Sequence, residues 1–149
     1  MSGSGLVQFV APEAGTLRYI GLGSGGAGTA AADINFALRL QNGVAEVRES
    51  NTYRAEIGFV AGDTFSIAVD ANVVRYFKNG GIFYTSATPV TSTLRLHAVL
   101  FNLNAAVSGI GLGGSPATSS TSPTTTTTTT EPRPRWARPR AAGSTPVVR

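Results

Sequence analysis

Turn-forming residues divide the central part of the chain into short segments of similar length. The Asn-Gly pairs at 42–43 and 79–80 tolerate the positive φ angles that a two-residue hairpin turn requires. Further turns are marked by Ser50-Asn51, by Ala61-Gly62-Asp63 and by Asp70-Ala71-Asn72. Segments of roughly six residues with turns every 8–12 residues or so are typical of an antiparallel β-sandwich or barrel.

The segments between these turns alternate in polarity as β-strands do. The clearest alternation runs from residue 34 to 41, where Ile34, Phe36, Leu38 and Leu40 share one face and Asn35, Ala37, Arg39 and Gln41 share the other. No segment shows a sustained helical period. We therefore predict an all-β chain with an antiparallel β-sandwich of jelly-roll type and little or no helix.

The composition changes sharply near residue 112. Residues 115–130 consist of Ser, Thr, Pro and Ala and end in an unbroken threonine run, and residues 131–149 are rich in Pro and Arg. Such segments have too little large apolar surface to offset the entropy lost on ordering. We predict a sandwich domain at 1–112 and a disordered linker or tail at 113–149.

The net positive charge of the chain arises in that tail. Residues 1–114 contain seven basic and seven acidic residues, so their net charge is zero, and five Arg against one Glu in residues 115–149 account for the +4 of the whole chain. A nucleic-acid partner is therefore expected only through the Arg-rich tail. The chain contains no cysteine and no run of 18 apolar residues, so we expect no disulfide, no membrane span and no cofactor.

Two segments in the middle of the chain resemble a known group of proteins. The residues from Gly62 to Asp70, GDTFSIAVD, are followed by VVRYFKNG at 73–80 and FYTS at 83–86. This pattern is similar to the paired strands of concanavalin A-like sandwiches, which include SPRY-type and laminin G-like domains and modules of bacterial surface and secreted proteins. The resemblance covers most of residues 5–110 and implies a concanavalin A-like sandwich in an extracellular or cell-surface protein, although residues 1–10 do not form a signal peptide.

Residues that could carry catalysis are few. A glycosidase needs two carboxyl groups on either side of the sugar bond, but Glu46 and Glu49 fall on opposite faces of one strand and are interpreted as solvent-facing charges. Glu56 has the spacing for a same-face pair with Arg54. His97 is the only histidine and is expected on a sheet surface. We expect no catalytic residue, no metal site and no enzymatic activity.

Aromatic side chains provide the better argument for binding. Adjacent rings at 76–77 and 83–84 must send one ring to each face of a strand, and an exposed tyrosine beside arginine can stack on a sugar or dock a peptide. Packing of hairpins is the alternative role for these rings. The candidate ligand-binding residues are Tyr53, Arg54, Arg75, Tyr76 and Tyr84.

Two functional hypotheses follow. The first is a non-catalytic binding or adhesion module of an exported, multidomain bacterial protein, with a glycan or a surface protein as its partner. The second is a structural module of a surface fibre or appendage that acts by self-association through its edge strands or its tail. The oligomeric state at increasing concentration distinguishes the two.

Overall fold

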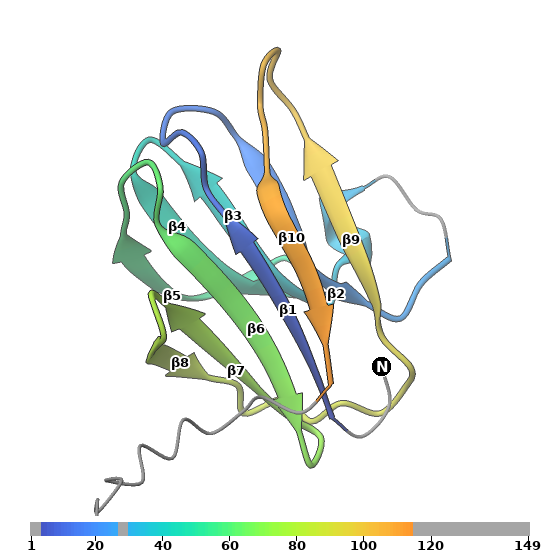
Figure 1. Cartoon of the computed structure of the whole chain (residues 1–149). Helices are drawn as coiled ribbons and strands as arrows, with labels where there is room; N and C mark the ends of the chain where they lie inside the picture. Colours follow the sequence, from blue (N-terminus) through green and yellow to red (C-terminus); the bar gives the residue numbers. More distant parts are fainter. Residues whose placement is uncertain (1–3, 27–29, 115–149) are drawn as a thin grey trace, which may run out of the picture. The chain divides into compact units, whose positions relative to one another are not determined.

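The computed structural model describes residues 4–26 and 30–114, which form two five-stranded antiparallel sheets packed as a sandwich (Figure 1). Sheet A has the order β10-β1-β6-β7-β8. Its strands are β10 (Ser108–Gly113), β1 (Gly5–Val10), β6 (Thr64–Asp70), β7 (Val73–Lys78) and β8 (Gly81–Thr85). The β-sandwich predicted from the turns and the alternation is confirmed.

Sheet B has the order β5-β4-β3-β2-β9. Its strands are β5 (Thr52–Gly58), β4 (Val44–Glu49), β3 (Phe36–Gln41), β2 (Arg18–Gly23) and β9 (Arg95–Leu100). A single short 3₁₀ helix, η1 (Ala31–Asp33), accompanies the strands in the described residues, where no helix is long and apolar enough to cross a membrane. The tail at 115–149 lies outside the described residues, so its disorder and the boundary at residue 112 stay predictions.

Left-handed turn residues connect neighbouring strands as the sequence predicts. Asn42 and Gly43 have φ angles of 50° and 74°, and Asn79 and Gly80 have 48° and 82°. The same conformation occurs at 50–51 and at 71–72. Two consecutive residues with positive φ produce a turn whose twist matches that of the strands, so each pair places the next strand beside the previous one.

The core lies between the sheets and takes alternate residues from the inner strands of each sheet. Fully buried members include Phe9, Phe65 and Ile67 from sheet A and Ile20 and Leu38 from sheet B. Strand β2 is buried on both faces. The reason is that residues 30–35 fold back over its outer face, and Gly21 permits this because a Cβ there would lie 2.1 Å from the Phe36 carbonyl oxygen.

Among the described residues, two charged side chains are buried in the sandwich, Arg18 and Glu49, and Arg18 is the more completely buried. Arg18 is fully buried and donates hydrogen bonds to the carboxylate and the carbonyl of Glu13 and to the Thr16 hydroxyl, all within the loop that joins β1 to β2. Burial lowers the pKa of the guanidinium, but an arginine stays protonated at any ordinary pH. Glu13 therefore neutralises a charge that would otherwise be very costly to bury.

The Gly-Asp and Lys-Asn-Gly turns that carry the sequence resemblance meet at one end of the sandwich. Asp63 accepts hydrogen bonds from the Val60 amide at 2.9 Å and the Asn79 side chain at 2.8 Å, and its carboxylate lies 3.0 Å from Lys78 Nζ. Asn79, in turn, accepts a bond from the Thr64 amide. The hydrogen bonds from Asn79, from the Val60 amide and from Lys78, in that order of size, lower the pKa of Asp63 to about 2. The two turns are therefore joined by side chains, a role that spacing alone does not reveal.

Candidate functional site

Polar side chains gather on the outer face of sheet B, over strands β3, β4 and β5. The alternation of β3 and β4 sends Leu38, Leu40, Ala45 and Val47 into the core and leaves the intervening residues on the outside. We call the resulting group the charged patch, and its members are Arg39, Gln41, Glu46, Arg48, Tyr53 and Glu56. The patch is built almost entirely from two hairpins, so its geometry depends on strand register.

Glu46 is the centre of the charged patch. It lies directly opposite Arg39 in the β3–β4 ladder. Its Oε1 accepts from Arg39 Nη1 at 2.8 Å, and its Oε2 accepts from Arg48 Nε at 2.8 Å and Nη2 at 2.7 Å. Arg39 also donates to the Gln41 side chain. The two guanidinium groups are thus held in fixed orientations and retain unused N–H donors, since each carries five.

Tyr53 lies beside this network on the neighbouring strand. It is opposite Arg48 in the β4–β5 ladder and is 49% exposed. Local desolvation, the carboxylates of Glu56 and Glu46 and a hydrogen bond to Glu56 raise the pKa of its hydroxyl. The phenol therefore stays neutral and remains a donor. Its ring offers a broad amphipathic surface next to fixed charges.

The charged patch is electrically neutral as a whole. Two arginines, Arg39 and Arg48, balance two glutamates, Glu46 and Glu56. On the other side of Arg39, the register places Tyr19 of β2, which packs with Ile34 and Ala37 into a small outer cluster. The patch therefore borders this small apolar cluster on one side and has no excess charge of either sign.

A second cluster of polar side chains lies on the side of the sandwich formed by β5 and β8, which are terminal strands of sheet B and sheet A. Glu49 is only 3% exposed, and its Oε2 accepts from Arg54 Nε at 3.1 Å and from the Thr88 hydroxyl at 3.2 Å. The buried ring of Tyr76 lies 5.8 Å from that of Tyr84. Burial, with Glu49 nearby, raises the pKa of Tyr76. We call these five residues the closed edge.

The structure separates the residues that the sequence indicated for binding. It brings Arg54, Tyr76 and Tyr84 together at the closed edge, and it places Tyr53 in the charged patch. Arg75 lies on the other sheet, where Nη1 is 3.6 Å from Asp70 Oδ2 and both side chains are substantially exposed. The five candidates therefore do not form one site, and Tyr76 is buried in the core.

Two interpretations of carboxylates need correction. Glu49 does not face solvent, because β4 turns Ala45, Val47 and Glu49 to the same inner face. Glu56 is not the partner of Arg54, because an irregularity between Val47 and Arg48 in the β4–β5 ladder pairs Arg48 with Tyr53 and leaves Arg54 directed to Glu49. The opposite faces predicted for Glu46 and Glu49 are confirmed.

The sequence contained a signal for the centre of the patch. A two-residue turn at 42–43 pairs residues whose numbers sum to 85, so Arg39 must face Glu46 and residue 37 must face Arg48. Opposite charges at directly paired positions stabilise a hairpin. The register rule, applied to that one turn, identifies the ion pair before any packing is known.

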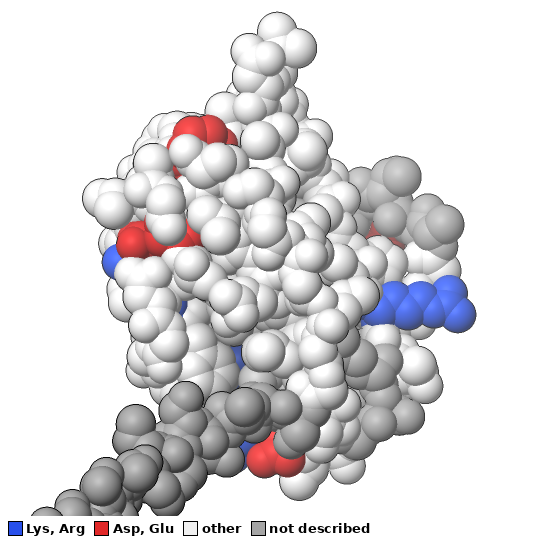
Figure 2. Space-filling view, in the orientation of Figure 1, with Lys and Arg blue, Asp and Glu red and all other residues white. Residues whose placement is uncertain are grey.

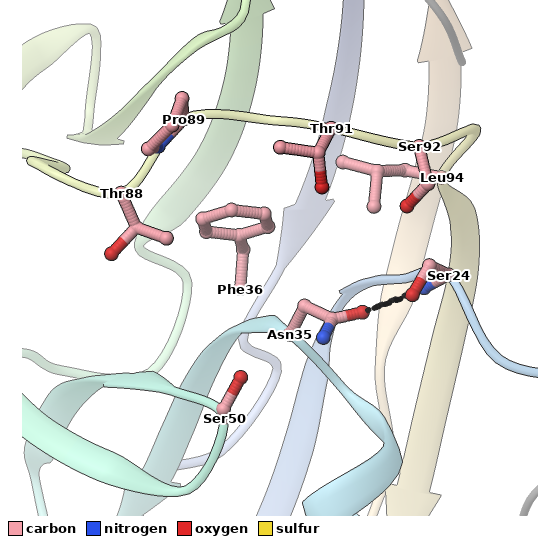
Figure 3. Close-up of a pocket in the computed structure, with 9 residues that line it drawn as sticks. All are labelled: Ser24, Asn35, Phe36, Ser50, Thr88, Pro89, Thr91, Ser92 and Leu94. Atoms are coloured by element: carbon pink, nitrogen blue, oxygen red, sulfur yellow. Dashed lines mark hydrogen bonds between the residues drawn. The ribbon is translucent and has the colours of Figure 1, made fainter.

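A small pocket lies near the end of the sandwich, between the loop after β8 and the starts of β3 and β5. Its volume is about 120 Å³, and Phe36 and Leu94 contribute apolar walls (Figure 3). The rest of its lining includes the hydroxyl groups of Ser50, Thr88 and Ser92 and the amide of Asn35, which accepts a 2.9 Å bond from Ser24. With a share of about 30 Å³ per water, this space holds a few waters rather than an oligosaccharide.

Metal-binding groups do not gather in the part of the chain that the structure describes. Among residues 4–26 and 30–114 there is no cluster of three or more His, Asp or Glu side chains that could hold an ion. His97 lies in β9 opposite Gly21, and its side chain lies against Gly23. The described residues thus offer binding chemistry by hydrogen bonds, charge and aromatic surface.

Comparison with known proteins identifies similar folds and no relative in sequence. No protein-family model matches the chain, and no curated protein matches it. Sheep galectin-11 in complex with glycerol is 16% identical, covers 75% of this chain and 91% of its own length, and has a TM-score of 0.45. A double variant and a single variant of human galectin-16 are each 14% identical, cover 76% of this chain and 89% of their own, and have a TM-score of 0.46. These similarities concern the β-sandwich fold alone. At this level of sequence identity, neither a ligand nor the role of any residue can be inferred from the galectins.

Proposed function

We propose that this chain is a non-catalytic carbohydrate-binding module that recognises a neutral glycan through the charged patch. The observation that supports the proposal is the clamp of Arg39 and Arg48 on Glu46 beside the half-exposed ring of Tyr53. Sugar hydroxyls donate and accept hydrogen bonds at the same time. A network that presents fixed N–H donors and carboxylate acceptors side by side matches that requirement.

The neutrality of the patch favours an uncharged ligand. An acidic glycan or a nucleic acid needs surplus positive charge, whereas two arginines and two glutamates cancel here. The apolar face of a sugar ring has a natural contact in Tyr53, whose ring is exposed beside Arg48. Because the ion pairs already hold the guanidinium groups in place, little side-chain entropy is lost on binding.

The arrangement of carboxylates supports a role without catalysis. Glu46 and Glu56 are the closest approach to a glycosidase pair, since they face each other across β4 and β5. However, both oxygens of Glu46 are engaged by arginines, and the pair lies on the outer face of a sheet. Glu49 is buried in the closed edge. Cleavage requires an acid and a base placed on either side of the sugar bond, which this arrangement does not provide.

The setting of the module is also part of the proposal. An extracellular or cell-surface location in a multidomain bacterial protein rests on the sequence resemblance and on the Thr- and Pro-rich residues 115–130, which are typical of linkers in secreted proteins. Secretion assays with the complete gene product would test it. A protein found only inside the cell would contradict this part of the proposal and leave glycan binding open.

The decisive test is a glycan array probed with the full chain, followed by calorimetry on the strongest neutral oligosaccharide. Tyr53→Ala and Arg48→Ala should each weaken binding by about tenfold or more, because each removes a group in direct contact with the sugar. Arg75→Ala is the matched control, since Arg75 is a comparably exposed arginine on the opposite sheet. It should leave the affinity unchanged.

Three results would contradict the proposal. These are absence of binding to every neutral glycan, a preference for acidic glycans, and a loss of affinity in Arg75→Ala equal to that in Arg48→Ala. Glu46→Gln tests the same site in a second way. It preserves the shape of the side chain but loosens both arginines, so we expect weaker binding with an unchanged circular-dichroism spectrum.

A further inference from the structure

Strands β9 and β10 end the two sheets on the same side of the sandwich (Figure 1). In β9, Leu96 and Leu100 pair with Leu22 and Arg18 of β2, both of which point inward. In β10, Leu112 pairs with the fully buried Val7, and Ile110 lies two residues before it on the same face. These side chains therefore belong to the inner faces of the sandwich.

Their inward direction does not bury them. Leu100 is 49% exposed, Ile110 is 48% exposed and Leu112 is 63% exposed. The loop that joins the two strands adds Leu103 at 90% and Phe101 at 53%. The Phe101 ring lies 5.7 Å from that of Tyr19, in the outer cluster of sheet B. We call these five residues the open edge, because here large apolar side chains of the two terminal strands and of the loop between them are exposed to solvent.

The open edge also lacks the features that keep terminal strands apart. Apart from the exposed Arg95 at the first position of β9, the two strands and the loop between them, residues 96–114, contain no Asp, Glu, Lys, Arg or Pro. Figure 2 shows the face that carries β10, β1 and β6 as largely free of charged groups. Monomeric proteins usually protect an exposed edge with lysine, proline or a charged side chain that points inward, because unpaired strand edges recruit other strands.

We propose that the open edge is a self-association surface and that its partner is the open edge of a second copy of this chain. Two observations favour an identical partner. None of the five residues of the open edge is charged, and Arg95, at the first position of β9, is the one charged residue of the two terminal strands. Residues 1–114 have seven basic and seven acidic residues and hence no net charge to oppose approach. Both terminal strands lie on one side, so a twofold axis there continues sheet A and sheet B at once.

The size of the surface sets the strength of the contact. A six-residue strand is about 20 Å long, and two sheets about 10 Å apart present a side roughly 20 Å thick, including their side chains. Two copies then bury on the order of 1,000 Å² in total, which is near the lower limit for a specific interface. We therefore expect a dimer that dissociates in the micromolar range.

Dimerisation goes beyond glycan binding because it does not involve the charged patch. Each copy keeps the outer face of its β3–β5 strands free, so a dimer presents two charged patches. A bivalent dimer binds a glycan-covered surface with an avidity that exceeds the affinity of one patch.

Sedimentation velocity of the full chain, over a series from about 1 μM to about 500 μM, tests the proposal across the expected dissociation constant. The wild type should shift from monomer to dimer. Leu112→Lys and Leu100→Lys place a charge in each half of the interface and should each raise the dissociation constant at least about tenfold. Ile82→Lys is the matched control, since Ile82 is 57% exposed on β8 at the far side of sheet A, and it should dimerise as the wild type does.

A wild type that stays monomeric throughout the series would overturn the inference. So would self-association that persists in both edge variants, because the contact would then lie elsewhere, or a loss of dimer in Ile82→Lys alone. Amide hydrogen exchange provides a second readout, with protection of β9 and β10 that increases with concentration. Glycan binding by the Leu112→Lys monomer, measured in solution, separates failure of this inference from failure of the proposed function.

Discussion

The two sides of the sandwich at which its sheets end differ in polarity and in burial. At the closed edge, Glu49 is buried and engages Arg54 and Thr88, with Tyr76 and Tyr84 packed beside it. At the open edge, Leu100, Ile110 and Leu112 face inward and remain about half exposed or more. A sandwich must solve the same problem at both sides, which is how to separate its interior from water.

The difference teaches what each side can do. The bonds that Arg54 and Thr88 make to Glu49 Oε2 favour a single arrangement, because losing either one leaves a buried charge less satisfied. Glu49 Oε1 and the Tyr76 hydroxyl are buried at the same edge without a hydrogen-bond partner among the described residues. An uncharged apolar side loses little when another surface covers it. The closed edge is therefore suited to fixing the fold of one chain, while the open edge is suited to contact between chains.

The largest expected effect on stability is found by comparing two isoleucines of the same sheet, both of which face the interior. Ile67 in β6 is fully buried, and Ile110 in β10 is 48% exposed. Ile67→Ala should lower the free energy of unfolding by about 3 kcal/mol, within the usual range for a buried aliphatic residue, and Ile110→Ala by less than about 1 kcal/mol. Urea unfolding at low protein concentration measures the monomer. Equal losses would show that the two positions are equally buried and that the open edge is closed in solution.

The next effect compares two arginines of similar exposure. The Arg54 side chain is 40% exposed and pairs with a carboxylate that is 3% exposed, whereas Arg75 is 35% exposed and pairs with Asp70, which is 50% exposed. Arg54→Ala leaves the Glu49 charge buried and should cost about 2 kcal/mol, below the 3–5 kcal/mol of a fully buried pair. Arg75→Ala should cost less than about 0.5 kcal/mol. If both variants unfold at the same urea concentration, the closed edge does not depend on its ion pair.

The smallest effect concerns Asp63, which joins the turn after β5 to the turn after β7. Its pKa of about 2 in the folded protein lies below the ordinary value of 3.8. A depressed pKa means that this carboxylate stabilises the fold above about pH 4, and that the stabilisation disappears as the pH falls toward about 2. In Asp63→Asn this part of the pH dependence should vanish. Thermal unfolding from pH 2 to pH 6 compares the two proteins, and parallel curves would contradict the assignment.

Local rules explain how much of this molecule could be predicted. The turns at 42–43 and 79–80 follow from residues that accept positive φ, and the alternation of β3 follows from period two. The pairing of Arg39 with Glu46 is also local, since the length of one turn determines the register. Most of the strands and the centre of the charged patch were therefore within reach of the sequence.

The sequence by itself determined the β class, the hairpins and the faces that alternate along each strand, because these depend on the φ preferences of a few residues and on neighbours in the chain. Only the tertiary structure decided which face is inside. It buried Tyr76 and Glu49, directed Arg54 to Glu49 through an irregular pairing, and brought β9 and β10 to one uncovered side. Those outcomes depend on how the two sheets pack. The strands of each sheet come from distant parts of the chain, so local residue preferences do not determine that packing.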